Sequence, residues 1–488
     1  MTLAYCQPQS VLPGDEVMVH VSAPGPTATI EVVRDGVAPG CVLRQDVRVA
    51  EHAIPDDAPE AGCRWPATLA FRVGEDWRSG CYLVRVTLAG AAGPALPTAF
   101  FVVRARRPSA DRMLLVLATN TWNAYNDVGG RNYYTGSVEA SFARPLGRGM
   151  LAKPDERGAR LASVVPGTFV DAYVGGVSEH GLSMWHGMAG WATWERRFAV
   201  WAEGAGYALD YAINADLERV PGLLEGRRLY LSVGHDEYWS WGMRDAVESF
   251  VGAGGNAAFL SGNVCYWQVR LAGDVQTCFK HRFREDPLFG TDRQRLTTTI
   301  WADPILGRPE TQMTGVSFTR GGYSRIAGSV PHASGGYVVH RPEHWAFEGT
   351  RLRFGDLLGA RDVVVGYECD GCELAMVDGR PVATGRDACP PGFEVLATAP
   401  AMPFDRHTTP LELPPGGEYE LEFHAQRLLG DDSVASCDRL RYGHAVLGCY
   451  TRGGIVLTTG CTDWVHGLGD PSIDRVTCNV LDRLGRRA

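Results

Sequence analysis

The sequence predicts an α/β protein in which a mainly parallel sheet is flanked by helices, with an N-terminal β-sandwich domain and a β-rich insertion. Three observations predict this fold class. Short alternating strands fill the first part of the 488-residue chain, buried strands then alternate with amphipathic helices, and further strand-like segments interrupt that alternation. We therefore expect a first domain over residues 1–107 and an α/β domain over 108–488, with the inserted lobe within about 275–440.

The first domain is predicted to be a sandwich that resembles immunoglobulin modules. Val17, Val19 and Val21 occupy alternate positions, which is the period of a half-buried strand. Further strands follow in ATIEVVRDG, CYLVRVTLAG and AFFVVRARRP, separated by turns rich in Gly and Pro. Several short strands at this spacing are typical of a sandwich. The segment RARRPS, at 104–109, is the natural linker to the second domain.

The pattern changes to α/β alternation after this linker. The apolar run MLLVLATN (113–120) predicts a strand buried on both faces, and ERRFAVWAEGAG (195–206) has helical spacing. A strand at RRLYLSVG is followed by a helix for which Ser240 is the expected cap, and then by a strand at NAAFLSGN. Among the later segments, DVVVGYECDG and GGEYELEFHA are predicted to be strands, while SIDRVTCNVLDRL predicts a closing helix.

Composition excludes several classes of function. A net charge of −9 argues against a nucleic-acid platform, and Lys153 and Lys280 are the only lysines, which we attribute to coding bias. No stretch approaches the roughly 20 apolar residues of a membrane helix, and the start MTLAYCQPQS lacks a signal peptide. The odd count of 13 cysteines favours reduced thiols. We therefore expect a cytoplasmic protein that binds neither nucleic acid nor membrane.

Polar residues gather where predicted strands end. Ligands of an open parallel sheet bind outside the carboxyl ends of its strands. The polar residues at four such ends are Tyr125, Tyr133 and Tyr134, then His235, Asp236 and Glu237, then Asn263, and finally Glu368 and Asp370. Phenolate and carboxylate oxygens are ligands for a hard cation such as ferric iron. A metal with an open position polarises a carbonyl and activates water, and a neighbouring His or carboxylate moves the proton, as amide or ester hydrolysis requires.

Each of these residues also has a purely structural interpretation. The tyrosines could be packing residues, Asp236 could only favour the dipole of the helix after it, and His235 could be a hydrogen-bonded loop histidine. Two other sites are alternatives. Cys265, in GNVCYW, could be the nucleophile of a cysteine-dependent hydrolase on an amidotransferase-like sheet, and Cys369 with Cys372 forms a lone CxxC pair that could bind zinc. A third hypothesis is that the chain is a non-catalytic binding protein.

A series of motifs resembles a known family. In chain order they are NTWNAYNDVGGRNYY, SFARP (141–145), VGHDEYWS, LSGNVCYWQVR (260–270), TGV (314–316), HWAFEGT (344–350), VVGYECD and TDWVHGL. From about residue 75 to the C-terminus the sequence resembles the large (beta) subunit of N,N-dimethylformamidase. HDEYWS and GNxxYW together carry most of the specificity of this resemblance.

The resemblance implies an amidohydrolase that cleaves the C–N bond of a small amide with a mononuclear Fe(III) ion held by two tyrosines and one glutamate. Carried onto this sequence, the iron ligands are Tyr125, Tyr134 and Glu237, and the catalytic pocket residues are His235, Asn263 and Glu368. Tyr133 and Tyr173 stay open as alternatives for the second tyrosine. The side chains expected to make the pocket partly apolar are Trp122, Trp239, Tyr266 and Trp267. The family enzyme works with a small partner subunit, so a homo-oligomer and a small partner both stay open here.

Overall fold

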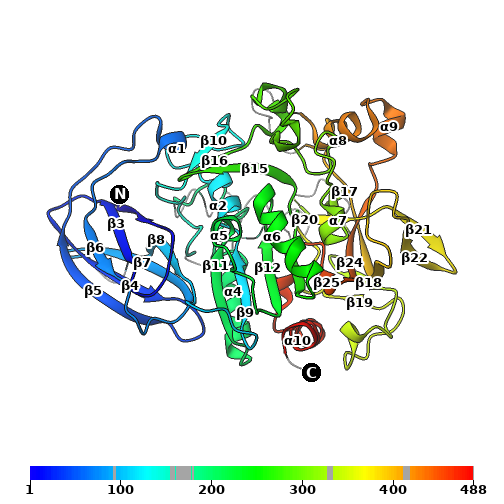
Figure 1. Ribbon diagram of the computed structural model, residues 1–488, viewed down its shortest axis with the longest axis horizontal. Coiled ribbons are helices and arrows are strands. Elements are labelled where there is room, and N and C mark those ends of the chain that lie inside the picture. The colour runs from blue at the N-terminus through cyan, green and yellow to red at the C-terminus, as the bar shows by residue number, and fades with distance from the viewer. Residues whose placement is uncertain are drawn as a thin grey trace.

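A nine-stranded sheet forms the centre of the molecule (Figure 1). The computed structural model describes residues 1–91, 95–153, 160, 177, 181–326, 333–409 and 418–486. The strands of this sheet are, in spatial order, β11 (Leu209–Ile213), β9 (Met113–Leu117), β12 (Leu229–His235), β14 (Asn256–Gly262), β25 (Gly454–Thr458), β24 (Gly443–Arg452), β23 (Glu394–Ala401), β18 (Tyr337–Val339) and β19 (Leu357–Leu358). Neighbours are parallel from β11 to β25 and antiparallel from β25 to β19. A mixed α/β fold with a large sheet that is parallel over its first five strands confirms the predicted class.

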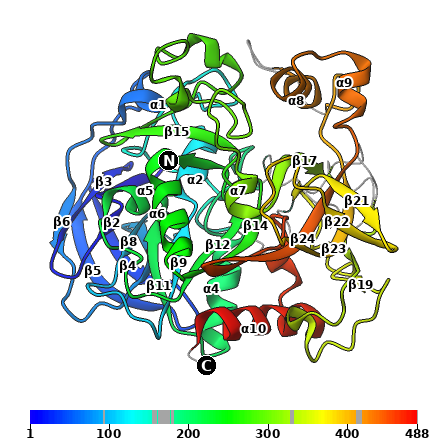
Figure 2. The ribbon, with the colours of Figure 1, turned by 45° about the vertical axis from the view of Figure 1, so that its right-hand side comes forward.

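Helices cover both faces of the parallel half of the sheet (Figure 2). They are α4 (Glu195–Gly204) and α10 (Pro471–Gly485) on one face, and α5 (Asn214–Arg219) and α6 (Trp241–Gly252) on the other. Leu115 of β9 packs in the core with the first pair of helices, whereas its neighbour Leu114 packs with the second pair. Because alternate residues enter two separate cores, both must be apolar, and this explains the unbroken run at the start of the α/β part.

The helix α6 begins where the sequence predicts. The side-chain oxygen of Ser240 accepts a hydrogen bond of 3.3 Å from the backbone N–H of Met243, as an N-cap residue does. Its buried residues Met243, Val247 and Val251 recur at helical spacing and pack against the sheet.

Two further sheets hold the N-terminal strands. Their members are β1 (Leu3–Gln7), β3 (Glu16–Ser22) and β6 (Leu69–Arg72) in one sheet, and β2 (Ser10–Val11), β8 (Pro97–Val103), β7 (Gly80–Leu88), β4 (Thr27–Arg34) and β5 (Gly40–Arg48) in the other. Side chains from both sheets share one core, in which Val19 and Phe101 are buried. The opposite faces of β7 and β8 contribute Leu83 and Phe100 to the core of the large sheet. The sandwich therefore packs on the α/β part through its own strands, while its immunoglobulin-like topology and the boundary at 107 stay predictions.

The remaining described elements lie outside the large sheet and the N-terminal sheets. These are α1 (Ala58–Ala61), α2 (Thr119–Tyr125), β10 (Glu139–Ser141), β13 (Tyr238–Ser240), β15 (Trp267–Ala272), β16 (Val275–Thr277), the 3-10 helix η1 (Lys280–Glu285), η2 (Gln294–Leu296) and α7 (Thr311–Thr314). Later in the chain come β17 (Ser317–Tyr323), η3 (Trp345–Phe347), β20 (Glu368–Gly371), β21 (Leu374–Val377), β22 (Arg380–Ala383), α8 (Glu420–Leu429), α9 (Val434–Asp438) and η4 (Trp464–Gly467).

The region after residue 275 differs from its prediction in three ways. Strands β18, β19 and β23 join the large sheet instead of a separate inserted lobe. The segment DVVVGYECDG becomes a strand only at its end, as β20, which pairs with β17 in a small antiparallel sheet. The segment GGEYELEFHA was wrongly expected to be a strand, because the helix α8 begins at Glu420. Leu421 and Ala425, four residues apart, pack together in a small core with α9, and this contact favours the helical period.

Candidate metal centre and its cavity

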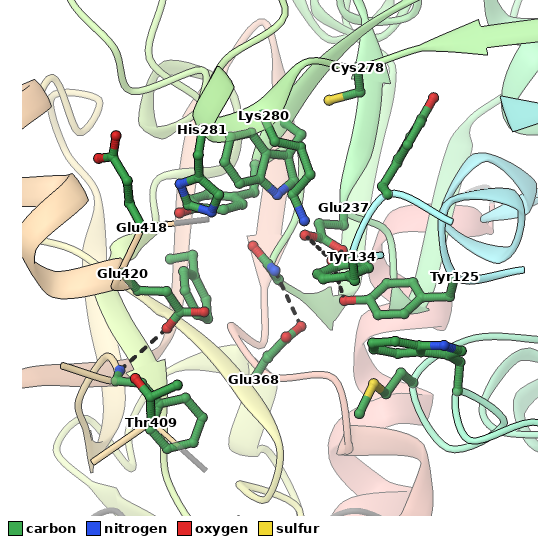
Figure 3. A pocket seen from close by; sticks show the side chains of 18 of the residues that line it. Tyr125, Tyr134, Glu237, Cys278, Lys280, His281, Glu368, Thr409, Glu418 and Glu420 are labelled. Atoms are coloured by element: carbon green, nitrogen blue, oxygen red, sulfur yellow. Dashed lines mark hydrogen bonds between the residues drawn. The ribbon is translucent and has the colours of Figure 1, made fainter. Parts of the chain in front are cut away.

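Three oxygen-bearing side chains from three segments meet beside the ends of the parallel strands. Tyr125 is the last residue of α2, Tyr134 lies in the loop after it, and Glu237 follows β12. The hydroxyl oxygens of Tyr125 and Tyr134 are 2.5 Å apart, and the Tyr134 hydroxyl is 3.1 Å from each carboxylate oxygen of Glu237 (Figure 3). The backbone N–H of Glu237 donates to the side chain of Thr121 at 2.9 Å, which ties the end of β12 to α2. The structure thus brings the three predicted ligands together.

The choice between the adjacent tyrosines follows from their hydroxyl groups. The Tyr133 hydroxyl donates at 2.7 Å to the backbone carbonyl of Gln276, in β16, and makes no described contact with Glu237. The Tyr134 hydroxyl instead receives a hydrogen bond of 2.9 Å from Tyr238. Tyr134 therefore fits the predicted ligand position better than Tyr133, and Tyr173 lies outside the described residues.

His235 lies between two carboxylates behind the oxygen cluster. Its Nδ1 donates to the carbonyl of Met188 at 2.8 Å, so its Nε2 faces the carboxylates. This Nε2 is 2.6 Å from a carboxylate oxygen of Glu368 and 3.3 Å from one of Glu237. Both contacts are ion pairs, because neither carboxylate oxygen lies in the direction that a hydrogen bond from Nε2 requires. Burial lowers the pKa of His235, but the carboxylates of Glu368 and Glu237 outweigh it and raise this pKa well above its usual value. In the metal-free protein this environment favours the protonated form of His235.

The local backbone aims His235 at this position. Gly234, directly before it, has a φ of 80°, and a Cβ there would lie 2.4 Å from the Cβ of Trp194. Only glycine adopts this conformation and tolerates this contact. The neighbouring Asp236 turns away from the site, since its carboxylate accepts hydrogen bonds from Ser232 and Asn214. Asp236 is thus held by hydrogen bonds in the core and not at the start of α6, whose N-cap is Ser240, so its role differs from the helix-dipole role suggested by the sequence.

Glu368 and Asn263 complete the polar wall. The Asn263 side-chain N–H donates to Glu368 at 3.2 Å, while the backbone N–H groups of Asn263 and Val264 donate to Asp370 at 3.0 Å. Asn263 has a φ of 50°, a conformation that asparagine adopts more readily than most residues. Its side-chain oxygen has no hydrogen-bond partner within the described part of the chain. Glu368 reaches the site from the start of β20, not from the end of a strand of the parallel sheet as the sequence indicates.

The charge of the cluster calls for a cation. Burial, reinforced by the charge of Glu237, raises the phenol pKa of Tyr125 and of Tyr134 well above 10. Two phenols cannot lose their protons beside a carboxylate unless a strongly charged ion replaces those protons. No group of three His, Cys, Asp or Glu side chains forms a metal site among the described residues. Any metal at this position would therefore depend on phenol oxygens, and the oxygen set present fits a hard cation.

Sequence reasoning missed two residues that contact Tyr134. The ammonium group of Lys280, in η1, lies 3.3 Å from the centre of the Tyr134 ring, and Tyr238 donates to the Tyr134 hydroxyl. Burial lowers the pKa of Lys280 to about 8, although the charge of Glu237 acts in the opposite direction. The only signal in the sequence was that Lys280 is one of two lysines in a chain that otherwise uses arginine.

A cavity of about 200 Å³ opens in front of the oxygen cluster. Tyr125, Tyr134 and Glu237 lie at one end, and Glu418 and Glu420, beside and in α8, lie across the cavity from them (Figure 3). The aromatic side chains between the two ends are Tyr266, Trp267, Phe318, Tyr323 and Phe404. Tyr266 and Trp267 line the cavity as predicted. Trp122 and Trp239 do not, because the first donates to Glu195 and the second to the carbonyl of Asp236 within the core.

A family model and known proteins match this chain in sequence. The model of the family "N,N-dimethylformamidase beta subunit-like, C-terminal" matches residues 30–477. The chain belongs to this family. The N,N-dimethylformamidase beta subunit of Alcaligenes sp. is 24% identical over 354 residues, which are 64% of this chain and 43% of that protein. The beta subunit of Paracoccus aminophilus is 27% identical over 199 residues, 36% of this chain and 24% of that protein. The chain spans less than half the length of the relatives it matches.

The positions of Cys265 and of the CxxC pair do not favour the two alternative sites, a cysteine nucleophile and a zinc ion. Cys265 is fully buried in the core beneath α6, and it does not line the described cavity. Burial raises its pKa well above 9, which opposes the thiolate that a nucleophile requires. Cys369 and Cys372, the CxxC pair, enter different cores, the first opposite Cys461 and the second beside Cys389. They cannot share one zinc ion.

Within the described residues, each helix is too short or too polar to cross a bilayer.

Proposed function

We propose that this chain is a metal-dependent amidohydrolase that cleaves the C–N bond of a small amide, with mononuclear Fe(III) held by Tyr125, Tyr134 and Glu237. One observation carries the proposal: three acidic oxygen side chains from separate segments converge at one wall of a cavity, with two phenol oxygens 2.5 Å apart. Membership of the family supports the reaction class. The metal and its ligands are proposed from the donor set.

The ion and the residues around it have different tasks. When bound, Fe(III) supplies Lewis acidity, which polarises an amide carbonyl and acidifies water. Tyr125, Tyr134 and Glu237 would hold the ion through three negative oxygens, and all three residues line the cavity that would admit the substrate. Lys280, above the Tyr134 ring, favours the phenolate form of that tyrosine because a cation stabilises a nearby anion.

The second group of residues handles protons and orientation. The protonated His235 and the carboxylate of Glu368 form a buried pair next to Glu237. Glu368 can take a proton from water and return it to the leaving amine, and His235 holds Glu368 in place. Asn263 has a second side-chain N–H beyond the one that binds Glu368, and it can donate to the carbonyl oxygen as charge develops there. The aromatic walls exclude water from the rest of the substrate.

The substrate and partners belong to the proposal. The relatives are named as beta subunits of N,N-dimethylformamidase, so the substrate class proposed here is a small amide. Their names also describe one subunit of a larger enzyme, and we include a small partner subunit or a homo-oligomer in the proposal.

A pair of adjacent tyrosine variants tests the metal centre. Iron-loaded wild-type protein should contain stoichiometric iron, absorb visible light through tyrosinate-to-iron charge transfer, and hydrolyse formamides. Tyr134→Phe should lose the colour and most of the activity, because the variant lacks one of the three oxygens. Tyr133→Phe is the matched control, since its hydroxyl binds a backbone carbonyl outside the cluster, and it should keep both.

The measurement is metal analysis, the visible spectrum and the rate of amine release, on all three proteins in parallel. A colourless wild-type protein without bound iron would refute the metal assignment. Equal loss of iron in the Tyr133 and Tyr134 variants would show that the aromatic loop is needed only for folding.

A further inference from the structure

The cavity has a second polar end beneath helix α8. We call this end the α8 subsite, and it consists of Phe318, Tyr323, Phe404, Glu418 and Glu420. It faces the oxygen cluster across the cavity, so a substrate held at the metal end can extend into it (Figure 3). Nothing in the proposed hydrolysis uses these five residues.

Glu420 is the fixed centre of the α8 subsite. The Tyr323 hydroxyl donates to one carboxylate oxygen at 2.7 Å, and the backbone N–H of Phe404 donates to the other at 3.3 Å. In the described part of the chain no arginine, lysine or histidine forms an ion pair with Glu420. Burial raises the pKa of Glu420 to about 8, although the charge of Lys280 acts in the opposite direction, so near neutral pH the empty site favours the protonated acid and a bound cation would favour the carboxylate.

Aromatic residues lie next to this carboxylate. The rings of Tyr323 and Phe404 are stacked with centres 4.1 Å apart, and Phe318 meets Tyr323 edge-on at 5.4 Å. A desolvated carboxylate among aromatic faces is the combination that binds ammonium groups, through charge and through cation–π attraction. A neutral apolar substituent would need no carboxylate, and an anionic one would be repelled.

The charges of the whole cavity favour the same ligand. The described lining residues include four carboxylates, Glu237, Glu368, Glu418 and Glu420, and three basic side chains, Lys280, His281 and Arg282. Burial lowers the pKa of His281 well below 6.5, which favours its neutral form. Lys280 lies at the metal end over Tyr134, and Arg282 is already paired with Glu285. The buried side-chain oxygen of Asn263 is an additional acceptor without a partner among described groups, and its residue lines the same cavity. Because Glu237 belongs to the proposed metal centre and Glu368 is paired with His235, Glu418 and Glu420 are the described lining carboxylates left for a ligand.

We propose that the α8 subsite recognises an ammonium group on the substrate, so that the amide hydrolysed by this chain carries a basic amine arm. Glu420 is the specificity-determining residue of this recognition. The inference rests on the proposed function for the amide half of the ligand, whereas the amine half depends only on the α8 subsite.

Direct binding of two matched amides tests this inference. The probes are an acetamide with an aminopropyl group on its nitrogen and the acetamide with a butyl group of similar length. Calorimetry on iron-loaded wild-type protein should show about tenfold tighter binding of the amine-bearing probe, equivalent to ~1.4 kcal/mol. Glu420→Gln should remove this preference, since glutamine keeps acceptor capacity for Tyr323 and loses the charge.

Glu422→Gln is the matched control. Glu422 lies on the same helix, pairs with Arg406 and does not line the cavity, so this variant should keep the preference. Equal affinity of the wild-type protein for both probes, or an unchanged preference in Glu420→Gln, would overturn the α8 subsite. If the preference is present but neither probe is hydrolysed, the subsite is supported and the proposed hydrolase function fails instead. The comparison of the two probes on wild-type protein needs no variant, so it tests the proposal even if Glu420→Gln folds poorly.

Discussion

Replacing His235 by glutamine should destabilise the metal-free protein strongly. The His235 side chain is fully buried, and its Nε2 lies 2.6 Å from Glu368 and 3.3 Å from Glu237. Glutamine leaves two buried carboxylates without their cation, and breaking such a pair costs about 3–5 kcal/mol. Unfolding entropy of ~2.1 cal/mol/K per residue gives about 1 kcal/mol per degree for 488 residues. The expected fall in Tm is therefore about 3–5 °C at pH 7.

A double-mutant cycle checks the physical reason for this loss. Wild type, His235→Gln, Glu368→Gln and the double variant are unfolded by urea after iron has been removed by chelation. If His235 acts through charge, the double variant should be less destabilised than the sum of the single variants, with a coupling of about 1–3 kcal/mol. A coupling within about 0.5 kcal/mol of zero would refute the ion-pair explanation and leave His235 as a packing residue.

Three other variants test separate parts of the structure. Cys265→Ala should keep amide hydrolysis and lose about 1 kcal/mol of stability in urea, because Cys265 is a core side chain; loss of turnover without unfolding would revive the nucleophile hypothesis. Glu195→Gln should grow more stable relative to wild type between about pH 4.5 and pH 8. Burial raises the pKa of Glu195 from 4.5 to about 8 in the folded state. Between these two pH values the folded wild type keeps a proton that the unfolded chain has lost, so the wild type loses stability as pH rises. Parallel curves of stability against pH for the two proteins would contradict this prediction. Ser240→Ala should reduce the free energy of unfolding by about 1 kcal/mol through loss of the α6 cap, and an unchanged urea midpoint would exclude that role.

Local sequence patterns predict the secondary structure correctly where one periodicity of apolar residues dominates a segment. The run at 113–117 is apolar at every position, which only a strand buried on both faces explains, and β9 follows it. The segment that became α8 is different. Its apolar residues Leu421 and Phe423 alternate as in a strand, but Leu421 and Ala425 also lie on one side of a helix. The choice depends on α9, which comes later in the chain and buries that side.

The candidate site also contains residues that sequence patterns predict and residues that they do not predict. Tyr125, Glu237 and Asn263 follow strands of one parallel sheet, so the rule that such strand ends converge placed them together before any coordinates were known. Lys280 obeys no such rule. It reaches Tyr134 because η1 packs across the sheet edge, and a contact between residues so far apart in sequence leaves no local pattern.

The two ends of the cavity therefore differ in how freely they can change. The oxygen cluster is held by the ends of β9 and β12, whose positions are fixed by hydrogen bonding within the large sheet. The α8 subsite is held by α8, by β17 of the small antiparallel sheet and by the loop near Phe404, none of which is a strand of the large sheet (Figure 2). Substitutions in α8 can alter which substituent is accepted at little cost to the sheet, since the stability of parallel strands does not depend on that helix. In the proposed enzyme, chemistry and substrate choice would depend on separate structural elements, so a change at Glu420 should alter binding preference and leave the iron spectrum unchanged.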